Sequence, residues 1–594
     1  LSGKVTSASN NEALTGVTIY NAAKKINVTT DVEGRFSIRL APGSYELTFS
    51  LTGYKTKTIN EIAVANGQLN ELNIVLVEQK KELDEVVVTA TPARRESANA
   101  VLSMQKNNTS VSDGISSESI KKSPDRNVGE VLKRVTGTSV QDDKYVIVRG
   151  LNDRYNIATI NGAVMPSTEP DRRTFSFDVV PSDMIDNVLI NKTATPDMPG
   201  EFSGGIVQVT TKDIPYKNAF GLAFSTSYNT ISTGKDFNIG HRGSLDYLGF
   251  DDGTRSFPSR FPSTNRWRTL PLDQKIQLSR RMYNTYGDDI SKALPGLNGQ
   301  INFAKKFNGK KGGTYGVLGA VTYRNSQTIQ VTDRQQYGDA TGTNNLLFDY
   351  ADTSYSFSTS LGALLNVGYK KGKNKFVLKN LFNRVFDNNN TIREGANFND
   401  LQYINKNRIA IAMVKTIFSS QLEGEHAVGK KNDKIKWNLN YAFTKKDQPD
   451  YRSQPYQKSL SQQDDKSVPY GVALRNTYRF WSELNENTLG GKVDYNKQLK
   501  WGNTVSSLKA GFLAQYKIRE FDARAFRYEA ADLNNFNSAL LTLSPGRVFN
   551  DGNMYAEGFY LNDITNNTDR YDANSLLTGS YLMLDNKFNE KWRL

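Results

Sequence analysis

The chain has 594 residues, of which 38% are hydrophobic, with a formal net charge of +14 and no cysteine. Without cysteine it can form neither a disulfide nor a thiolate metal site. Its mean hydropathy is −0.55, and no apolar run approaches the ~20 residues of a membrane-spanning helix, which excludes a helical membrane protein. Lysine and arginine recur in short turns, and no nucleic-acid-binding motif is present, so we predict no nucleic-acid partner.

Residues 1–79 alternate between apolar and polar side chains in short runs. One run carries Tyr45, Leu47 and Phe49 on a single face, and turn signals at 31–34 and 42–43 separate neighbouring runs. This pattern predicts a small β-sandwich. Residues 1–79 contain no His-Glu pair of the kind that binds zinc in metallopeptidases, so we assign them no peptidase activity. A protein-interaction module and an inert spacer both remain open.

Residues 80–124 form the predicted tether and linker. The tether contains a strongly β-favouring run that ends before Pro92. The run consists of Glu85, Val86, Val87, Val88, Thr89 and Ala90. A lone apolar strand on a polar tether cannot bury itself, so we expect it to join the sheet edge of a partner. The alternative is a last sandwich strand, but charged residues at 79–82 separate the run from the sandwich.

The pattern of helix and strand signals in residues 125–215 predicts a small α/β unit. A helix is expected over 127–135, capped by Asp125, because its apolar residues fall at i, i+3, i+4 and i+7. Strands are expected at 145–150, 157–162 and 202–212. The positions that we single out are Arg149, Gly150, Asn161, Gly162, Gly204 and Gly205.

Two of these positions have competing interpretations. Gly204-Gly205 could belong to a phosphate loop, but no Gly-Lys-Ser/Thr follows, so a tight strand entry is favoured. Arg149 is either a surface arginine at a strand end or a residue that faces a polar wall, where it would form a fork-like pair with a carboxylate.

From residue 216 to 594 the chain alternates along long stretches. The clearest stretch places one set of side chains on one face and a second set on the other. The first set is Ile435, Trp437, Leu439, Tyr441 and Phe443; the second is Lys436, Asn438 and Asn440. Short basic turns alternate with long polar loops near 231–298, 327–354, 447–483 and 523–572. This asymmetry is typical of outer-membrane barrels. About ten strands are expected, too few to close a large barrel.

No catalytic constellation is present, and we predict no enzyme activity. His241 and His426 lie far apart without neighbouring ligands, so no metal site is expected. Asp251-Asp252 is interpreted as a solvated turn; a calcium site is the less favoured alternative, because no spaced Asp-x-Asp-x-Asp loop follows. We expect no catalytic residue and no cofactor.

At Val148-Arg149-Gly150, at Asn161-Gly162 and at 200–212 the chain resembles TonB-dependent outer-membrane receptors. Residues 1–79 resemble the carboxypeptidase regulatory-like, transthyretin-type domain that precedes many Bacteroidetes receptors, including starch-utilisation type glycan importers. The run 85–90 resembles the TonB box. The resemblance implies a mainly β fold: a transmembrane antiparallel β-barrel, incomplete here and truncated within the barrel, with an α/β plug and an N-terminal sandwich.

The resemblance also implies function and partners. The expected location is the outer membrane of a Gram-negative bacterium, as a mature chain without its signal peptide. The expected partners are the TonB energy-transducing protein, outer-membrane lipid and an extracellular siderophore, oligosaccharide or peptide. A surface lipoprotein is a further candidate, although Asn161-Gly162 stands where lipoprotein-lidded glycan importers usually have Asp-Gly. The expected activity is import by energy-coupled plug rearrangement; the alternative is a plugged barrel with a structural, adhesion or secretion-associated role.

Overall fold

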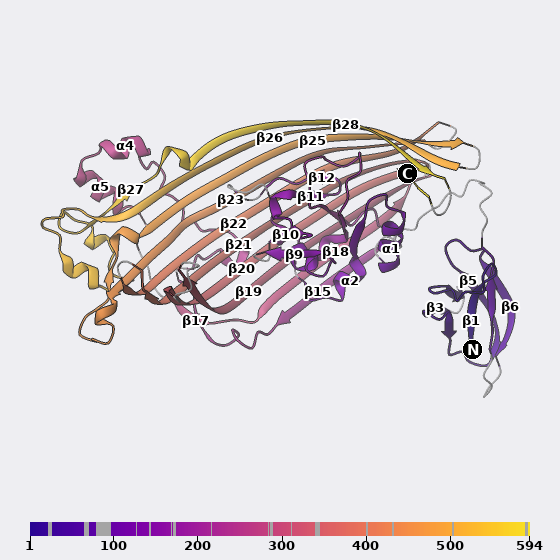
Figure 1. Cartoon of the computed structure of the whole chain (residues 1–594), viewed down its shortest axis with the longest axis horizontal. Helices are drawn as coiled ribbons and strands as arrows, with labels where there is room; N and C mark the ends of the chain where they lie inside the picture. The colour runs from indigo at the N-terminus through magenta and orange to yellow at the C-terminus, as the bar shows by residue number, and fades with distance from the viewer. Residues whose placement is uncertain are drawn as a thin grey trace. The chain divides into compact units, whose positions relative to one another are not determined.

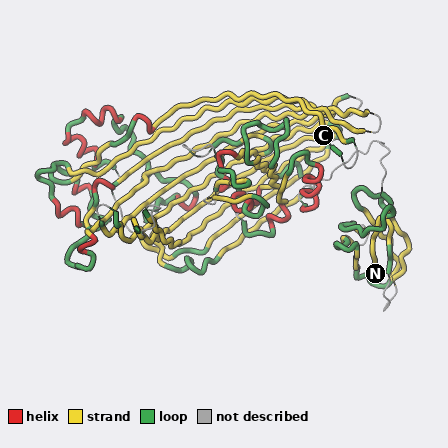
Figure 2. The backbone as a smooth tube through the Cα atoms, viewed as in Figure 1, coloured by secondary structure: helices red, strands yellow, loops and turns green. Residues whose placement is uncertain are grey.

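The computed structural model describes residues 1–21, 26–64, 71–78, 97–125, 127–141, 144–167, 169, 174–215, 217–240, 242–282, 284, 289–309, 312–338, 345–399, 402–429, 433–501, 504–588 and 592–593. The chain divides into two compact units, Leu1–Ala90 and Thr91–Leu594. Strand dominates both units and the helices are short (Figure 2). No helix within the described residues is both long and apolar enough to cross a membrane.

The first unit is the predicted β-sandwich. Its strands form two sheets, ordered β4-β1-β7 and β3-β2-β5-β6. These strands are β1 (Ser2–Ser7), β2 (Thr18–Asn21), β3 (Ile26–Thr29), β4 (Arg35–Ser37), β5 (Gly43–Ser50), β6 (Lys57–Val64) and β7 (Ile74–Leu76). Alternating side chains of both sheets, among them Val5, Ile19, Leu47 and Phe49, are fully buried between them. The period-two pattern therefore assigned this fold correctly.

The second unit begins with a compact α/β domain, the plug. Its main sheet has the order β12-β11-β14-β13-β8, and β9 pairs with β10 in a separate hairpin. The elements are α1 (Ala98–Asn107), β8 (Ser112–Ser116), α2 (Ser117–Lys121), α3 (Val128–Leu132), β9 (Thr138–Gln141), β10 (Tyr145–Val148), β11 (Asn156–Ile160), β12 (Ala163–Val164), β13 (Ile185–Asn191) and β14 (Gly205–Thr211). The helix expected at 127–135 is present in shortened form as α3.

Two local expectations for the plug differ from the structure. Residues 97–123, expected to be a linker with a brief helical tendency near Ser117 to Lys121, contain α2 at that place. They also contain α1 and the edge strand β8, which pairs with β13 from Ser112↔Asn191 to Ser116↔Asn187. Backbone hydrogen bonds to β13 hold β8 in the sheet. The side chains of β8 are mostly polar, so the hydrophobic pattern of the sequence did not predict this strand. Asn127, rather than Asp125, caps α3, because its side chain accepts a hydrogen bond from the Glu130 N–H at 2.9 Å.

Most of the rest of the unit is one antiparallel sheet of 12 strands, the wall. Neighbouring strands in sequence are mostly neighbours in the sheet, as Figure 1 shows. The strands are β15 (Ala219–Ser227), β18 (Gly296–Asn308), β19 (Gly313–Tyr337), β20 (Leu346–Lys371), β21 (Asn374–Asn397), β22 (Tyr403–Val428), β23 (Asp433–Ser459), β24 (Gly471–Val472), β25 (Tyr478–Trp501), β26 (Thr504–Ala530), β27 (Phe559–Asp563) and β28 (Arg570–Lys587). In the described residues β15 pairs with β18 alone and β28 with β26 alone, so the wall has two free edges.

The wall has a plug face and an outer face. The plug face contributes Leu364, Leu381 and Ile417 to the same apolar core as the plug helices and strands. On β23, Asn440, Ala442 and Thr444 are buried on this face, whereas Leu439 and Tyr441 are 57% and 39% exposed on the other. The structure thus separates the two sets of side chains on β23 as the alternation predicted.

The strands are longer than the sequence suggested. β23 has 27 residues, whereas a transmembrane strand needs about 9–11. Most of the loops expected at 327–354 and 447–483 are therefore strand, and β19 and β20 remain paired up to Tyr337↔Leu346. Polar residues predominate in the sequence of these extensions, although a few aromatic ones such as Tyr456 and Trp481 are buried, so hydropathy does not distinguish them from loops.

The connection between β15 and β18 folds over the outer face of the strand extensions. It contains β16 (Asp236–Asn238), α4 (Thr264–Thr269), α5 (Leu272–Ser279) and β17 (Ile290–Lys292). Trp267 of α4 packs against Phe526 of β26, with ring centroids 6.2 Å apart. Arg519, also on β26, contacts the plug. Phe526 lies an odd number of positions from Arg519, so it points to the opposite, outer face.

Candidate functional site

Two predicted plug motifs are tight two-residue turns. Arg149 and Gly150 have φ values of 53° and 74°, and Asn161 and Gly162 have values of 52° and 85°. Asn161-Gly162 joins β11 to β12, and two consecutive positive φ values in such a hairpin are the geometry that Asn-Gly favours. The backbone conformation accounts for glycine here, because an added Cβ at Gly150 or Gly162 would meet no atom within 4 Å.

Among the residues that the structure describes, no carboxylate pairs with Arg149. Its guanidinium Nη2 donates to the Gly204 carbonyl at 3.1 Å, and its backbone N–H donates to the Gly137 carbonyl at 2.9 Å. The side chain is exposed at the end of β10. Arg149 therefore joins its own turn to the start of β14, and these contacts favour the alternative of an exposed arginine at a strand end.

Asn161 fastens the second turn to the end of β14. Its Oδ1 accepts a hydrogen bond from the Thr211 N–H at 2.9 Å, and its Nδ2 donates to the Thr211 Oγ1 at 3.0 Å. The sequence offered no sign of Thr211, which is 50 positions away. The two turns thus attach to opposite ends of the same strand.

Gly204 and Gly205 form a tight strand entry. A Cβ at Gly204 would lie 2.1 Å from the Asn156 Oδ1, and one at Gly205 would lie 3.0 Å from the Val148 Cγ1. The Asn156 amide is itself held, because its Nδ2 donates to the Val146 carbonyl at 2.8 Å. Close packing therefore accounts for both glycines.

Replacing Gly204 with alanine is expected to destabilise the plug by about 1–3 kcal/mol, because the new methyl group must displace a hydrogen-bonded side chain. Hydrogen exchange of the plug strands at increasing urea concentration would measure the change. Gly200→Ala is the matched control, since a Cβ there meets no atom within 4 Å. Equal stability of the two variants would contradict the packing argument.

The predicted partner-binding run, Glu85 to Ala90, lies outside the described residues. Its role therefore stays a prediction.

The structure reveals a buried ion cluster where the plug meets the wall. Glu169 of the plug pairs with Lys415 of β22 at 3.2 Å and also with Lys446 of β23. Only 2% of the Lys415 side chain and 7% of the Glu169 side chain are exposed. Such a cluster stabilises the docked state strongly only as a complete set, because removal of one charge leaves another buried and unpaired.

Further groups complete this cluster. Lys415 lies 3.6 Å from the Asp178 carboxylate and donates to the Ser176 hydroxyl at 3.1 Å. Arg519 of β26 donates to the Glu169 backbone carbonyl. Three wall strands therefore hold one plug loop.

The pKa of Glu169 reflects these contacts. Burial raises the pKa of this carboxyl, but the charges of Lys415 and Lys446 outweigh burial and lower it to about 2, from an ordinary value of 4.5. The sequence gave little sign of this cluster, since its members lie hundreds of positions apart. The one available signal was a lysine, Lys415, within the apolar stretch from Ile409 to Phe418.

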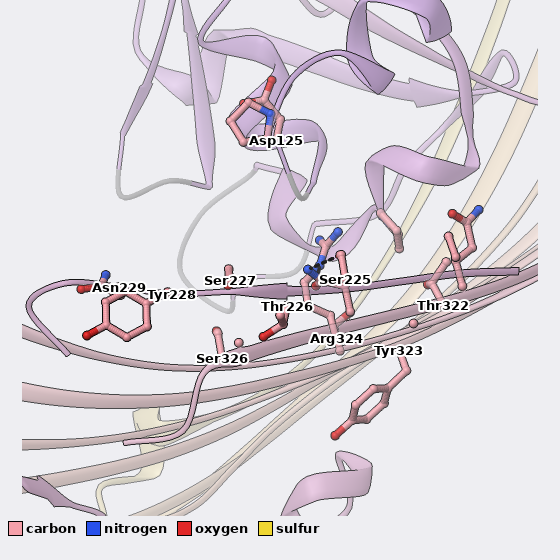
Figure 3. A pocket seen from close by; sticks show the side chains of 18 of the residues that line it. Asp125, Ser225, Thr226, Ser227, Tyr228, Asn229, Thr322, Tyr323, Arg324 and Ser326 are labelled. Carbon is pink, nitrogen blue, oxygen red and sulfur yellow. Dashed lines mark hydrogen bonds between the residues drawn. The ribbon is translucent and has the colours of Figure 1, made fainter. Parts of the chain in front are cut away.

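A polar cavity of about 530 Å³ lies between the plug and strands β15, β18 and β19. The plug contributes Ser123, Pro124, Asp125 and Pro181 to its lining. Figure 3 shows Asp125 on the plug side and Ser225 on the strand opposite, while Tyr323 points away from the plug. Hydroxyl and amide side chains of the wall make up most of the remaining lining.

Comparison with family models identifies both N-terminal domains. Residues 1–88 match the CarboxypepD_reg-like domain, and residues 103–206 match the TonB-dependent Receptor Plug Domain. A search of curated proteins finds no match to this chain.

Solved structures of outer-membrane receptors are remotely similar. The ferric citrate transporter FecA is 11% identical over 72% of this chain and 63% of its own, with a TM-score of 0.29. The ferric yersiniabactin uptake receptor FyuA from Yersinia pestis is 8% identical over 82% and 63%, with a TM-score of 0.33. The siderophore receptor PiuA from Acinetobacter baumannii is 9% identical over 80% and 62%, with a TM-score of 0.32.

This chain thus spans less than two thirds of the length of those three proteins. The assignment rests on the two domain matches and on the wall of long antiparallel strands against which the plug is packed. Along the chain, a domain that matches the carboxypeptidase regulatory-like model is followed by one that matches the TonB-dependent receptor plug model, and then by a wall of long antiparallel strands.

Proposed function

We propose that this chain belongs to an outer-membrane transporter that binds an extracellular ligand and imports it by energy-coupled rearrangement of the plug. The observation that carries the proposal is a receptor plug domain held against the wall by buried ion pairs. In this function, residues 1–79 form the N-terminal domain, residues 80–96 the tether, and residues from 216 onward the barrel wall.

The outer face supports a membrane location. Large apolar side chains are exposed on it along several neighbouring strands. They include Leu365, Val367, Leu378, Leu422, Leu439, Leu489, Val493 and Phe512. Exposing a contiguous apolar surface of this kind to water costs free energy, and contact with lipid acyl chains avoids that cost. Outer-membrane lipid is therefore the proposed partner of this face.

The plug contacts support a movable occupant. Lys415 and Lys446 reach Glu169 from the wall, and Lys375 of β21 pairs with Asp213 where the plug ends. Water can replace these ion-pair contacts when the plug moves, but the buried pairs and the apolar core that the plug shares with Leu364, Leu381 and Ile417 must first be separated by work. Force applied through the tether could then displace the plug.

We assign the tether run from Glu85 to Ala90 to the TonB energy-transducing protein. Three consecutive valines favour an extended strand, and strand addition draws its affinity from backbone hydrogen bonds. The extracellular ligand is a siderophore, an oligosaccharide or a peptide. A surface lipoprotein is an additional candidate partner.

Val87→Pro tests this assignment. Proline removes a backbone N–H and should abolish strand addition, so the purified receptor should no longer bind the periplasmic domain of the TonB protein in a calorimetric titration. Ala93→Pro, in the same tether but outside the run, is the matched control and should bind normally.

If the Val87→Pro variant binds the periplasmic domain of the TonB protein as the wild type does, this run does not couple the receptor to the energy protein. That result would favour the plugged barrel with a structural, adhesion or secretion-associated role.

A further inference from the structure

The charges that line the cavity between plug and wall are already engaged within the protein. Among the described lining residues, the charged ones are Asp125 and Arg324. Both Asp125 carboxylate oxygens accept hydrogen bonds from Arg134, at 2.5 and 3.0 Å, and the Arg324 Nε donates to the Asn298 Oδ1 at 2.8 Å. The lining thus holds one acidic and one basic side chain, both already in contact within the protein, so a ligand with a large net charge finds no cluster of opposite charge here.

Polar side chains cross the cavity floor in a row. Cross-strand pairing places Ser225 of β15 opposite Asn298 of β18, Asn298 opposite Arg324 of β19, and Arg324 opposite Ser360 of β20. A second row runs from Gln300 to Thr322. Directly paired residues have Cβ atoms about 4.5–5.5 Å apart, so the floor presents hydrogen-bonding groups at regular intervals.

The hydroxyl surface continues beyond the cavity. Ser354, Ser356 and Ser358 lie at alternating positions of β20 before Ser360, so all four share the plug face. The Ser358 Oγ donates to the Asp387 Oδ1 at 2.7 Å. Small hydroxyl groups therefore continue along β20 from the strand extension to Ser360 at the cavity.

We infer that this cavity binds a neutral, hydroxyl-rich ligand, a carbohydrate, as the cargo of the proposed transporter. A sugar hydroxyl both donates and accepts hydrogen bonds, and so do Ser, Thr, Asn and Gln side chains. An anionic iron chelate would instead need excess lysine or arginine. The inference rests on the proposed function and requires no lipoprotein lid.

Ala223→Trp tests the inference by filling the cavity from β15. Ala223 lines the cavity on the plug face and pairs across the sheet with Gln300. The probes are maltotriose, cellotriose and mannotriose, titrated calorimetrically into the purified full chain in detergent. We expect at least one trisaccharide to bind, and Ala223→Trp to weaken its binding by about tenfold or more.

Ala219→Trp is the matched control, because Ala219 lies on the same strand and face, four positions away and outside the lining. It should leave binding unchanged. Thr322→Val removes a cavity hydroxyl while keeping the side-chain shape, and it should weaken the same trisaccharide even if Ala223→Trp does not fold.

The absence of trisaccharide binding would overturn the inference. So would binding that neither variant weakens, or cavity-dependent binding of ferric citrate or N-acetyl-trialanine amide in place of the sugars. The assay needs no energy protein, so its failure is separate from that of the Val87→Pro experiment. If the protein binds a trisaccharide in the cavity and the Val87→Pro variant still binds the TonB protein normally, only the proposed transport function is contradicted.

Discussion

Replacing Glu169 with glutamine is expected to loosen the plug from the wall by about 3–5 kcal/mol, the usual cost of breaking a buried ion cluster on one side. The substitution leaves Lys446 without its carboxylate and leaves Lys415 with Asp178, 3.6 Å away. Hydrogen exchange of the plug strands, measured with the receptor in detergent, reports this opening free energy directly.

Glu118→Gln is the matched control within the same domain. Glu118 pairs with Lys122 at 3.0 Å, but both side chains are largely exposed. Pairs of this kind contribute little to stability, so plug exchange should not change. A second change, Lys415→Met in the Glu169→Gln protein, should restore part of the loss, because it removes the stranded charge. Equal exchange in the Glu118 and Glu169 variants would show that the cluster does not hold the plug.

Acid should act on the same cluster. The folded pKa of Glu169, about 2, lies below its ordinary value of 4.5. The carboxylate therefore stabilises the docked plug fully above about pH 4.5, and this contribution is lost as the pH falls toward 2. After correction for the intrinsic pH dependence of amide exchange, the opening free energy of the plug in the wild-type protein should fall across that window, and in Glu169→Gln this component of the fall should disappear.

The sequence was most informative where burial is periodic. Alternation in the first unit and along β23 identified the sandwich core and both faces of the wall, since a strand with one buried face must alternate. The same criterion failed over the strand extensions and at β8, because neither depends on a continuous apolar face. Backbone pairing, which leaves no mark in hydropathy, holds these segments.

The candidate site divides in the same way. Asn161-Gly162 was singled out through its resemblance to a receptor motif, and the two-residue hairpin turn that it forms is one that this dipeptide favours. The partners of Arg149 and Glu169 were not recognisable, because they depend on which distant strands face the plug. Lys446, for example, lies 277 positions from Glu169. The conformation of a turn can be predicted from its own residues, whereas contacts between the plug and the wall depend on the three-dimensional arrangement of distant strands.

Replacing Leu439 with lysine should cost about 2–4 kcal/mol if this residue lies near the middle of the bilayer. Leu439 is exposed on the outer face of β23 between Trp437 and Tyr441, and the neighbouring strand presents Leu489 on the same surface. A lysine there must lose its hydration or draw water and headgroups into the membrane. Urea titration of the protein folded into lipid vesicles would measure the difference in folding free energy.

Ile435→Lys supplies the depth control on the same strand and face. Ile435 lies next to the short connection between β22 and β23, where the bilayer should end, and lysine there should cost only about 0–1 kcal/mol. The gradient between the two positions distinguishes a lipid-facing surface from a protein interface, which would penalise lysine at both sites without regard to depth. Equal urea midpoints for the Leu439→Lys variant and the wild-type protein would place this face in water, and the proposed membrane-spanning wall would have to be abandoned.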